Sequence, residues 1–335
     1  MMRLPKFEYV SPATVKEACG LLKKYGSDAR ILAGGTDLLV ACKLRIESPA
    51  YLISLKKIKG LNGIRLVKRE GLKVGAMTTP GEIRDNPIVL KHYTALSQAA
   101  RSVGTPPLQE MGTLGGNLCL NTRCIYYNQS DTWRKVRERC LKMGGKVCHV
   151  VPKGKKCYAV FSGDMAPSLL ALGAKVKLVR GLGERLIPLE NLYSGDSREP
   201  ISLKVGEFLS EVILPPPVEK QSSIYLKYRL RGGIDFPLAG VAVRVVLNGK
   251  GNCTGCKVVL TGVGPLPVVV SEVGEALEGK RLNEELISQT SQMAIKSAHP
   301  VPNASGSTPT YRRRMVGILT KRALFSVAKD LGMNH

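Results

Sequence analysis

Four cysteines lie close together in a polar, basic part of the chain: Cys124, Cys140, Cys148 and Cys157, with gaps of fifteen, seven and eight residues. A zinc site typically uses CxxC pairs, which this spacing lacks. Iron–sulfur centres need four thiolates that converge on one cluster, and they accept varied spacings. The surrounding residues have little apolar pattern with which to build a core, so four unrelated buried thiols explain the pattern poorly. The spacing therefore favours an iron–sulfur centre.

The other five cysteines have simpler explanations. Cys19 and Cys42 fall in apolar segments and are predicted core residues. Cys119 precedes the first of the four and could compete as a ligand, but we expect it to lie against the neighbouring glycine-rich turn. Cys253 and Cys256 form a single CxxC on a predicted hairpin strand. Because no second pair accompanies them, a structural role is favoured.

Three glycine-rich turns form a second group: AGGTDLL from Ala33, GAMTT from Gly75 and GTLGGNL from Gly112. Paired glycines let the backbone approach a ligand, and the free N–H groups and hydroxyls donate to anionic oxygens. Together the turns predict a pyrophosphate site, although each alone is compatible with an ordinary tight turn. None fits GxGxxG or the P-loop pattern, so a Rossmann or Walker site is disfavoured.

Length and composition limit the class of protein. A chain of 335 residues with 44% hydrophobic and 23% charged residues predicts two or three globular domains. No run reaches the roughly eighteen apolar residues of a membrane helix. The N-terminal sequence has no apolar core of a secretory signal. We therefore expect a cytoplasmic protein without a membrane partner, whose nine cysteines are free, metal-bound or redox-active.

The formal net charge of +24 predicts attraction to acidic partners. Nucleic acid is disfavoured, because the chain has no zinc-finger spacing, no basic-leucine heptads and no aromatic RNA-binding signature. Between Arg134 and Lys156 there are nine lysines and arginines against one glutamate. This segment is expected to present a positive outer surface for an acidic protein, with a merely solvated charged loop as the alternative.

The predicted elements alternate between strands and helices. A helix capped by Ser11 and closed by Gly26 leads into a β-turn-α-β unit over residues 29–55. A capping box follows at Thr79–Glu82, and a longer helix is predicted from Pro87 to Val103. The remaining predictions are strands at 64–67 and 72–76, a helix running into a strand over 165–179, short strands over 184–195 and 207–214, a proline-rich boundary at 215–220, a hairpin around Asn248-Gly249 and C-terminal helices.

The ordered motifs resemble the FAD-binding subunits of molybdenum-containing hydroxylases, such as the medium subunit of carbon monoxide dehydrogenase and the flavin domain of xanthine dehydrogenase. The motifs are ILAGGTDLL, VGAMTT, GTLGGNL, SGDMAPSLLALGA, YLKYRLRGGIDFPLAGVAV and YRRRMVGILTKRAL. The resemblance covers essentially the whole chain. It implies an α+β fold: a two-part FAD-binding domain of the vanillyl-alcohol oxidase (PCMH) type over residues 1–57 and 58–220, then a smaller C-terminal α+β domain over 221–335.

The resemblance also implies which residues bind FAD. The first turn would surround the pyrophosphate together with the second, and the third would form another phosphate-facing loop. Asp164 would contact ribityl or ribose hydroxyls, with a helix cap as its alternative role, and Lys227 would lie near the flavin. The implied set is Ala33, Gly34, Gly35, Thr36, Asp37, Leu38, Ala76, Thr78, Thr79, Thr113, Gly115, Gly116, Asn117, Asp164 and Lys227.

About forty residues separate GGNL from the SGD motif, whereas most members of this family have almost none. This insertion, over 122–160, resembles the flavin subunit of 4-hydroxybenzoyl-CoA reductase, which carries an additional 4Fe-4S cluster there. The resemblance implies Cys124, Cys140, Cys148 and Cys157 as the cluster ligands. It also implies a molybdopterin-binding large subunit and a 2Fe-2S small subunit as partners, in a dimer of heterotrimers.

No nucleophile–base pair is evident, since the four histidines are scattered and only His149 lies near the cysteines. We therefore expect an oxidoreductase subunit that transfers electrons, with the substrate chemistry elsewhere. In the reductase branch, electrons would pass from ferredoxin, or a similar acidic carrier, through 4Fe-4S and FAD to molybdenum. The alternatives are a hydroxylase in which electrons flow outward and, more remotely, a basic iron–sulfur protein that binds nucleic acid.

Overall fold

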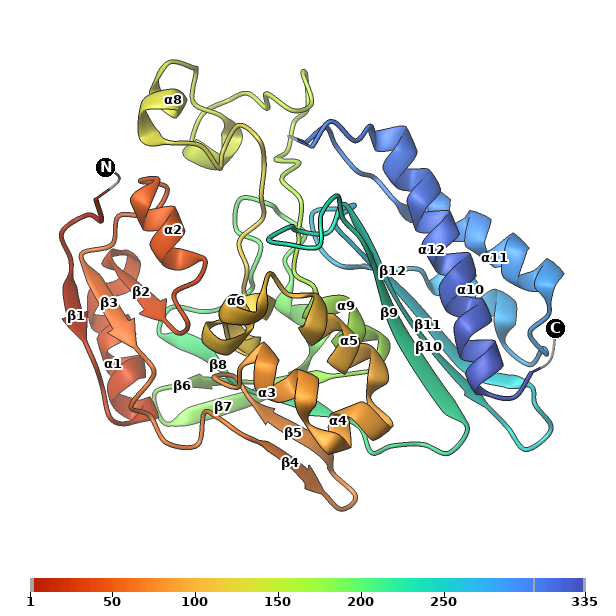
Figure 1. Cartoon of the computed structure of the whole chain (residues 1–335). Coiled ribbons are helices and arrows are strands. Elements are labelled where there is room, and N and C mark those ends of the chain that lie inside the picture. The colour runs from red at the N-terminus through yellow and green to blue at the C-terminus, as the bar shows by residue number, and fades with distance from the viewer. Residues whose placement is uncertain (1–2, 304, 334–335) are drawn as a thin grey trace.

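The computed structural model describes residues 3–303 and 305–333. Within these residues it contains three sheets, which follow one another along the chain over residues 8–54, 64–214 and 221–269 (Figure 1). The insertion, residues 122–160, extends from the body beside the N-terminal part. The mixture of helices and sheets confirms the predicted α+β class.

The first sheet has the parallel order β1-β3-β2. Its elements are β1 (Glu8–Val10), α1 (Val15–Tyr25), the 3₁₀ turn η1 (Gly26–Asp28), β2 (Ala29–Leu32), α2 (Leu38–Lys43) and β3 (Tyr51–Ser54). Helix α2 connects β2 to β3, so the predicted β-turn-α-β unit is confirmed. Cys19 and Cys42 are buried here, as their apolar neighbours predicted.

The N-terminal end of α1 differs from the prediction. Thr14, not Ser11, is the cap: its Oγ1 accepts from Glu17 N at 3.2 Å. Glu17 in turn accepts from Ala13 N at 2.8 Å. This reciprocal pair satisfies two N–H groups at once, so it outcompetes the earlier serine, whose hydroxyl is buried without a partner.

The second sheet is antiparallel, in the order β4-β5-β8-β6-β7. Its strands are β4 (Ile64–Val67), β5 (Gly71–Gly75), β6 (Lys175–Arg180), β7 (Gly183–Pro188) and β8 (Glu207–Leu214). The helical segments of this part are α3 (Pro80–Asp85), α4 (Pro87–His92), α5 (Thr94–Ser102), α6 (Pro106–Met111), α7 (Leu114–Leu118), α9 (Met165–Ala171) and the 3₁₀ turn η3 (Leu189–Leu192). Within the insertion, the helical elements among the described residues are α8 (Asp131–Lys135) and the 3₁₀ turn η2 (Leu141–Met143).

The single helix predicted from Pro87 to Val103 is wrong, because the chain leaves helical geometry at Tyr93. The ring of Tyr93 is fully buried and its hydroxyl donates to Pro215 O at 2.7 Å. This contact spans 122 residues. Side-chain periodicity within one helix does not reveal such a tertiary constraint. The capping box at Thr79 is confirmed.

The third sheet has the antiparallel order β12-β11-β10-β9. Its elements are β9 (Gln221–Tyr228), β10 (Ala239–Leu247), β11 (Cys253–Thr261), β12 (Val268–Val269), α10 (Ser271–Leu277), α11 (Glu284–Ser297) and α12 (Pro309–Asp330). The predicted hairpin around Asn248-Gly249 is confirmed as the turn between β10 and β11.

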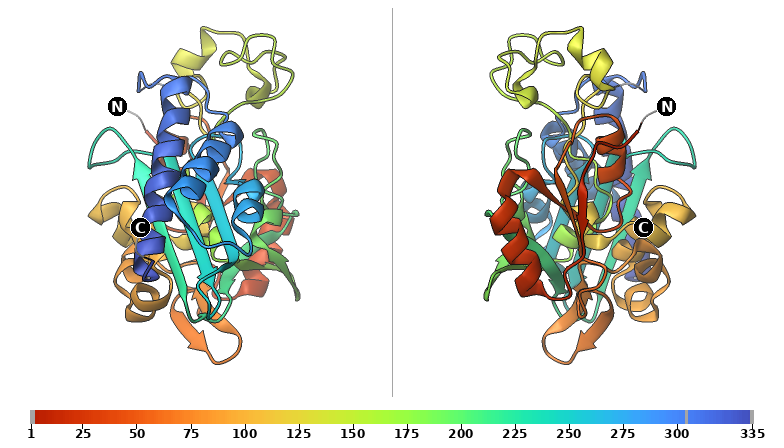
Figure 2. Two further views of the ribbon diagram at one scale, coloured as in Figure 1. Left: turned by 90° about the vertical axis from the view of Figure 1, so that its right-hand side faces the viewer. Right: turned by 90° about the vertical axis from the view of Figure 1, so that its left-hand side faces the viewer.

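Helices α10, α11 and α12 cover one face of this sheet (Figure 2), while α5 and α9 contact the other. Successive strand residues point to opposite faces, so alternate positions enter different cores. Tyr225 and Ala242 join the core of the second sheet. Val241 and Val243 join the core under the C-terminal helices. The third sheet therefore joins the two main cores of the molecule.

Candidate functional site

The first glycine turn packs directly on the backbone of a distant segment. It lies between β2 and α2, and Gly35 has a φ of +74°. A Cβ atom on Gly34 would lie 2.0 Å from Met111 O and 2.9 Å from Gly112 Cα. Only glycine permits this approach, so the first turn is held against the start of the third.

The second and third turns are joined by backbone hydrogen bonds. Leu114 N donates to Thr78 O and Gly115 N donates to Ala76 O, both at 2.8 Å. A Cβ atom on Gly115 would lie 3.0 Å from the Ala76 Cβ. The structure therefore brings together the three turns that the sequence places up to about eighty residues apart. We call residues 33–38, 75–79 and 112–117 the turn cluster.

Several polar side chains of the turn cluster already have structural partners. The Thr78 hydroxyl accepts from Gly63 N and donates to Gly63 O. Thr79 Oγ1 accepts from Glu82 N, and Thr113 Oγ1 accepts from Gly116 N at 3.1 Å. These hydroxyls fix the shapes of the turns.

Asn117 and Asp164 connect the turn cluster to α9. Asn117 Oδ1 accepts from Met165 N at 3.1 Å. Asp164 occupies the cap position of α9, but its carboxylate forms no capping hydrogen bond. It accepts instead from Tyr225 Oη at 2.8 Å and from Lys227 Nζ at 3.0 Å.

The Asp164–Lys227 ion pair is almost fully buried, with side-chain exposures of 6% and 3%. Burial raises the pKa of Asp164, while Lys227 and Tyr225 act in the opposite direction. Burial lowers the pKa of Lys227, while Asp164 raises it. Lys227 Nζ also donates to Ser102 O at 2.9 Å. The two predicted residues are thus in direct contact at the junction of α9, α5 and the third sheet.

The four cysteines of the insertion line one pocket. The aromatic and basic residues Tyr126, Tyr127, His149 and Lys142 line it too. Burial raises the pKa values of Cys124 and Cys157, and in each case neighbouring thiols of the set contribute in the same direction. We call this space the thiol pocket.

The thiols surround the pocket without forming a site for a single ion. Across residues 3–303 and 305–333, no group of three or more His, Cys, Asp or Glu side chains is arranged to hold a metal ion. The four thiols therefore share one pocket, but the described residues do not place them in a metal-ligating arrangement.

The remaining cysteines lie elsewhere. Cys119 ends α7 and packs against the core of the second sheet, and burial raises its pKa to about 12. Cys253 is buried in the C-terminal core, where Cys256 packs partly buried beside it. Burial raises the pKa of both thiols. Neither forms a disulfide.

Arg123 connects the insertion to the turn cluster, and sequence reasoning did not identify it. Its backbone pairs with Val160 at the other end of the insertion, with 2.8 Å hydrogen bonds in both directions. Its Nη1 donates to Asp37 Oδ1 at 2.6 Å, and its guanidinium lies 4.3 Å from the Phe236 ring centroid. The only feature of the sequence that points to a role for Arg123 is its position directly before Cys124.

Two of the nine basic residues counted in the insertion do not belong to its exposed surface. Arg134 is buried, and its Nη2 donates to Leu44 O and Arg45 O at 3.2 and 2.8 Å. Lys142 lines the thiol pocket. The other seven, which are exposed, are Lys135, Arg137, Arg139, Lys146, Lys153, Lys155 and Lys156.

Comparison with known proteins defines the class. Residues 5–217 match the FAD binding domain in molybdopterin dehydrogenase, and residues 224–327 match the CO dehydrogenase flavoprotein C-terminal domain. The chain therefore belongs to the FAD-binding medium subunits of the molybdenum hydroxylase family. As in its relatives, it is an oxidoreductase subunit.

Individual relatives agree with this assignment. The chain is 29% identical to the carbon monoxide dehydrogenase medium chain of Hydrogenophaga pseudoflava, over 96% of each. It is 32% identical to the aldehyde oxidoreductase FAD-binding subunit of Escherichia coli, over 71% of this chain and 76% of that one. The solved structure of the H. pseudoflava carbon monoxide dehydrogenase, in a form that lacks the Mo-pyranopterin moiety, matches with a TM-score of 0.81 and 27% identity, over 98% and 99% of the chains.

Within the described residues, no helix combines the length and the apolar character needed to cross a membrane.

Proposed function

We propose that this chain is the electron-transfer subunit of a molybdenum enzyme similar to 4-hydroxybenzoyl-CoA reductase, and that it carries one FAD and one 4Fe-4S cluster. The observation that supports the cluster is the thiol pocket, in which four cysteines from an otherwise polar insertion face one space. The assembled turn cluster supports the flavin site. The family assignment is supported by the two matching domain families.

FAD would be held by the turn cluster, whose close-packed glycines expose backbone for a pyrophosphate. The proposed contacts are those predicted from the sequence. Thr78 would contribute its backbone, because its hydroxyl is committed to Gly63. Asp164 and Lys227 would face the ligand from the junction with the third sheet. When bound, FAD can exchange electrons singly or in pairs.

Cys124, Cys140, Cys148 and Cys157 would be the cluster ligands. The insertion has few hydrogen-bonded elements, so metal binding would contribute directly to its folding. Cys119 is not in the proposed set, because it ends α7 and does not line the thiol pocket.

The partners and the direction of electron flow follow from the reductase-like proposal. A molybdopterin-binding large subunit and a 2Fe-2S small subunit would complete a dimer of heterotrimers. The seven exposed cations would attract an acidic donor such as a ferredoxin. Removal of an aromatic hydroxyl as water consumes two electrons and two protons, so this subunit would accept and pass on two single electrons for each turnover. The alternative function is that of a hydroxylase, in which electrons flow outward from molybdenum through FAD to an acceptor.

We also propose that the domains divide at residues 57 and 220 and that the protein is cytoplasmic. The domain division is supported by the sequence ranges of the three sheets, because no strand of one sheet crosses residue 57 or residue 220.

The test is to purify the protein without oxygen and to measure flavin absorption, iron and acid-labile sulfide. One FAD and four iron atoms per chain are expected from this subunit. Cys157→Ser should lose most of the cluster iron but keep the flavin, while Cys119→Ser should keep both. Wild-type protein with flavin but no cluster iron, or with zinc in its place, would refute the cluster. A flavin-free iron–sulfur protein would revive the nucleic-acid alternative.

The electron donor and the direction of electron flow are tested in a separate assay. Electron transfer from reduced ferredoxin should slow as ionic strength rises, because exposed charges are screened over about 8 Å at 0.15 M. A rate independent of salt would contradict docking to the basic insertion. Oxidation of an aldehyde or purine without reduction of an aryl-CoA would favour the hydroxylase alternative.

A further inference from the structure

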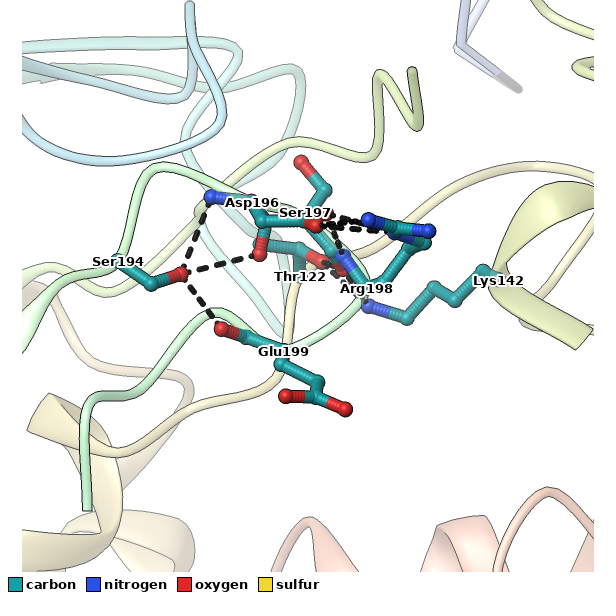
Figure 3. Close-up of polar contacts among 7 residues, drawn as sticks. All are labelled: Thr122, Lys142, Ser194, Asp196, Ser197, Arg198 and Glu199. Carbon is teal, nitrogen blue, oxygen red and sulfur yellow. Dashed lines mark hydrogen bonds and ion pairs between the residues drawn. The ribbon is translucent and has the colours of Figure 1, made fainter. Parts of the chain in front are cut away.

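Lys142 is the basic residue of the insertion whose side chain reaches back into the body of the protein beside the thiol pocket. Its Nζ donates to Asn121 Oδ1 at 2.8 Å, to Thr122 Oγ1 at 2.5 Å and to Ser197 O. Figure 3 shows the end of this side chain at the loop of residues 194–199. The loop lies outside the insertion, between η3 and β8.

The groups that accept from Lys142 are themselves fixed. Thr122 Oγ1 donates to Ser197 O at 2.8 Å, and Ser197 Oγ donates to Ala159 O at 2.7 Å. Thr122 and Ala159 belong to the two ends of the insertion. One loop of the body therefore holds both ends of the insertion and, through Lys142, its middle.

The loop supplies no negative charge at bonding distance from Lys142. The Asp196 carboxylate is paired with Arg198, 2.6 Å away (Figure 3). Among the described residues, Lys142 has no carboxylate oxygen within 4 Å, so its acceptors are neutral. Its positive charge is therefore not cancelled by a direct ion pair.

The side chain that carries this charge also borders the thiols. Lys142 lines the same pocket as the four cysteines. Its ammonium is anchored at Asn121 and Thr122, just before Cys124, one of those cysteines. By contrast, the buried Arg134 donates to carbonyls of the segment after α2 and does not line the pocket.

We propose that Lys142 tunes the iron–sulfur centre. The positive charge of Lys142, beside the thiol pocket, would stabilise the reduced state of that centre. This inference rests on the proposed function. Reduction adds one negative charge to a cluster, and a nearby cation in a poorly solvated site lowers the free energy of the more negative state. Lys142 would thereby make the centre easier to reduce by an external donor.

The experiment is a redox titration, followed by electron paramagnetic resonance, of the anaerobically purified protein with the subunits that accompany it. Lys142→Met keeps the reach of the side chain and removes its charge, whereas Lys142→Arg keeps the charge. Lys146→Met is the matched control, because it removes an exposed lysine from the same segment. Iron content is measured on every sample.

At a fixed potential, Lys142→Met should reduce the ratio of reduced to oxidised cluster about tenfold, which equals about 59 mV for one electron. Lys142→Arg and Lys146→Met should stay within about twofold of wild type. A ratio for Lys142→Met within twofold of wild type, in protein that holds its iron, would overturn the inference and leave the proposed function intact. Wild-type protein without cluster iron would overturn both.

If Lys142→Met does not retain iron, Lys142→Gln is judged by the same criterion, since its amide can still donate to the loop. If both neutral variants lose iron while Lys142→Arg retains it, the proposed effect on the reduction potential of the cluster is overturned. Lys142 would then only hold the insertion in place.

Discussion

The turn cluster and the insertion are both built around a candidate cofactor, but they are held in different ways. The turn cluster contributes Ala76 and Leu114 to the core of the second sheet, and its first and third turns touch at a distance that only glycine allows. The insertion has two short helical elements and two isolated bridges among its described residues. Its strongest contacts with the body come from the charged side chains Arg123, Arg134 and Lys142.

This difference determines how each region should respond to change. In a closely packed region an added atom displaces its neighbours, so the turn cluster should be sensitive to small increases in side-chain volume. A loop held by a few polar contacts should loosen locally while the rest of the molecule stays folded. Three substitutions test the contrast, and a fourth tests a partly exposed ion pair of the second sheet as a reference.

The largest effect is expected at the buried ion pair beside the turn cluster. Asp164→Asn leaves the Lys227 ammonium buried without its counter-ion, which should lower the free energy of unfolding by about 3–5 kcal/mol. Urea unfolding of the full chain measures it. Glu211→Gln is the control, because its partner Arg65 is 66% exposed and the loss should stay below about 1 kcal/mol. Equal losses would show that burial of the pair is unimportant.

The next effect concerns the glycine contact between the first and third turns. Gly34→Ala places a methyl group against Met111 O and should weaken FAD binding about a hundredfold, or about 2.7 kcal/mol. Titration of the flavin-free protein with FAD measures the affinity. Gly20→Ala, on the exposed side of α1 with open space around it, should bind FAD normally and gain up to about 1 kcal/mol in stability. Normal FAD affinity in Gly34→Ala would contradict the close-packed interpretation.

A smaller and local effect is expected in the insertion. Arg134→Met removes two charge-assisted hydrogen bonds to Leu44 O and Arg45 O, at a cost of about 2 kcal/mol. Limited proteolysis within the insertion should accelerate about thirtyfold, with flavin content unchanged. Lys135→Met, an exposed neighbour, should leave the rate near that of wild type. Loss of flavin from Arg134→Met would mean that the two regions fold as one unit.

The smallest effect is a pH dependence in the second sheet. Arg185 lowers the pKa of Glu207 through a 2.7 Å ion pair. A carboxyl whose pKa is lower in the folded state stabilises the protein above its unfolded pKa, about 4.3, and this contribution disappears as the pH falls through the folded value. Because Arg185 is 36% exposed, about 1 kcal/mol is expected. Glu207→Gln should have a flatter stability profile below pH 5, and an unchanged profile would contradict the assignment.

Local patterns predicted much of the fold. The β-turn-α-β unit, the Thr79 capping box and the hairpin at Asn248-Gly249 follow from residues within a few positions of one another, and all are present. The break at Tyr93 was missed because its cause, the contact with Pro215, lies 122 residues away. The same limit applied to Arg123, which reaches Asp37 across 86 residues.

The sequence by itself determined the family, the three glycine turns and the presence of four thiols in a polar insertion, because these depend on residue type and order. Only the tertiary structure decided that the turns touch, that Asp164 meets Lys227, and that the thiols share a pocket with Lys142. The physical reason is that such contacts depend on how whole elements pack. The spacing of residues along one segment does not contain that information.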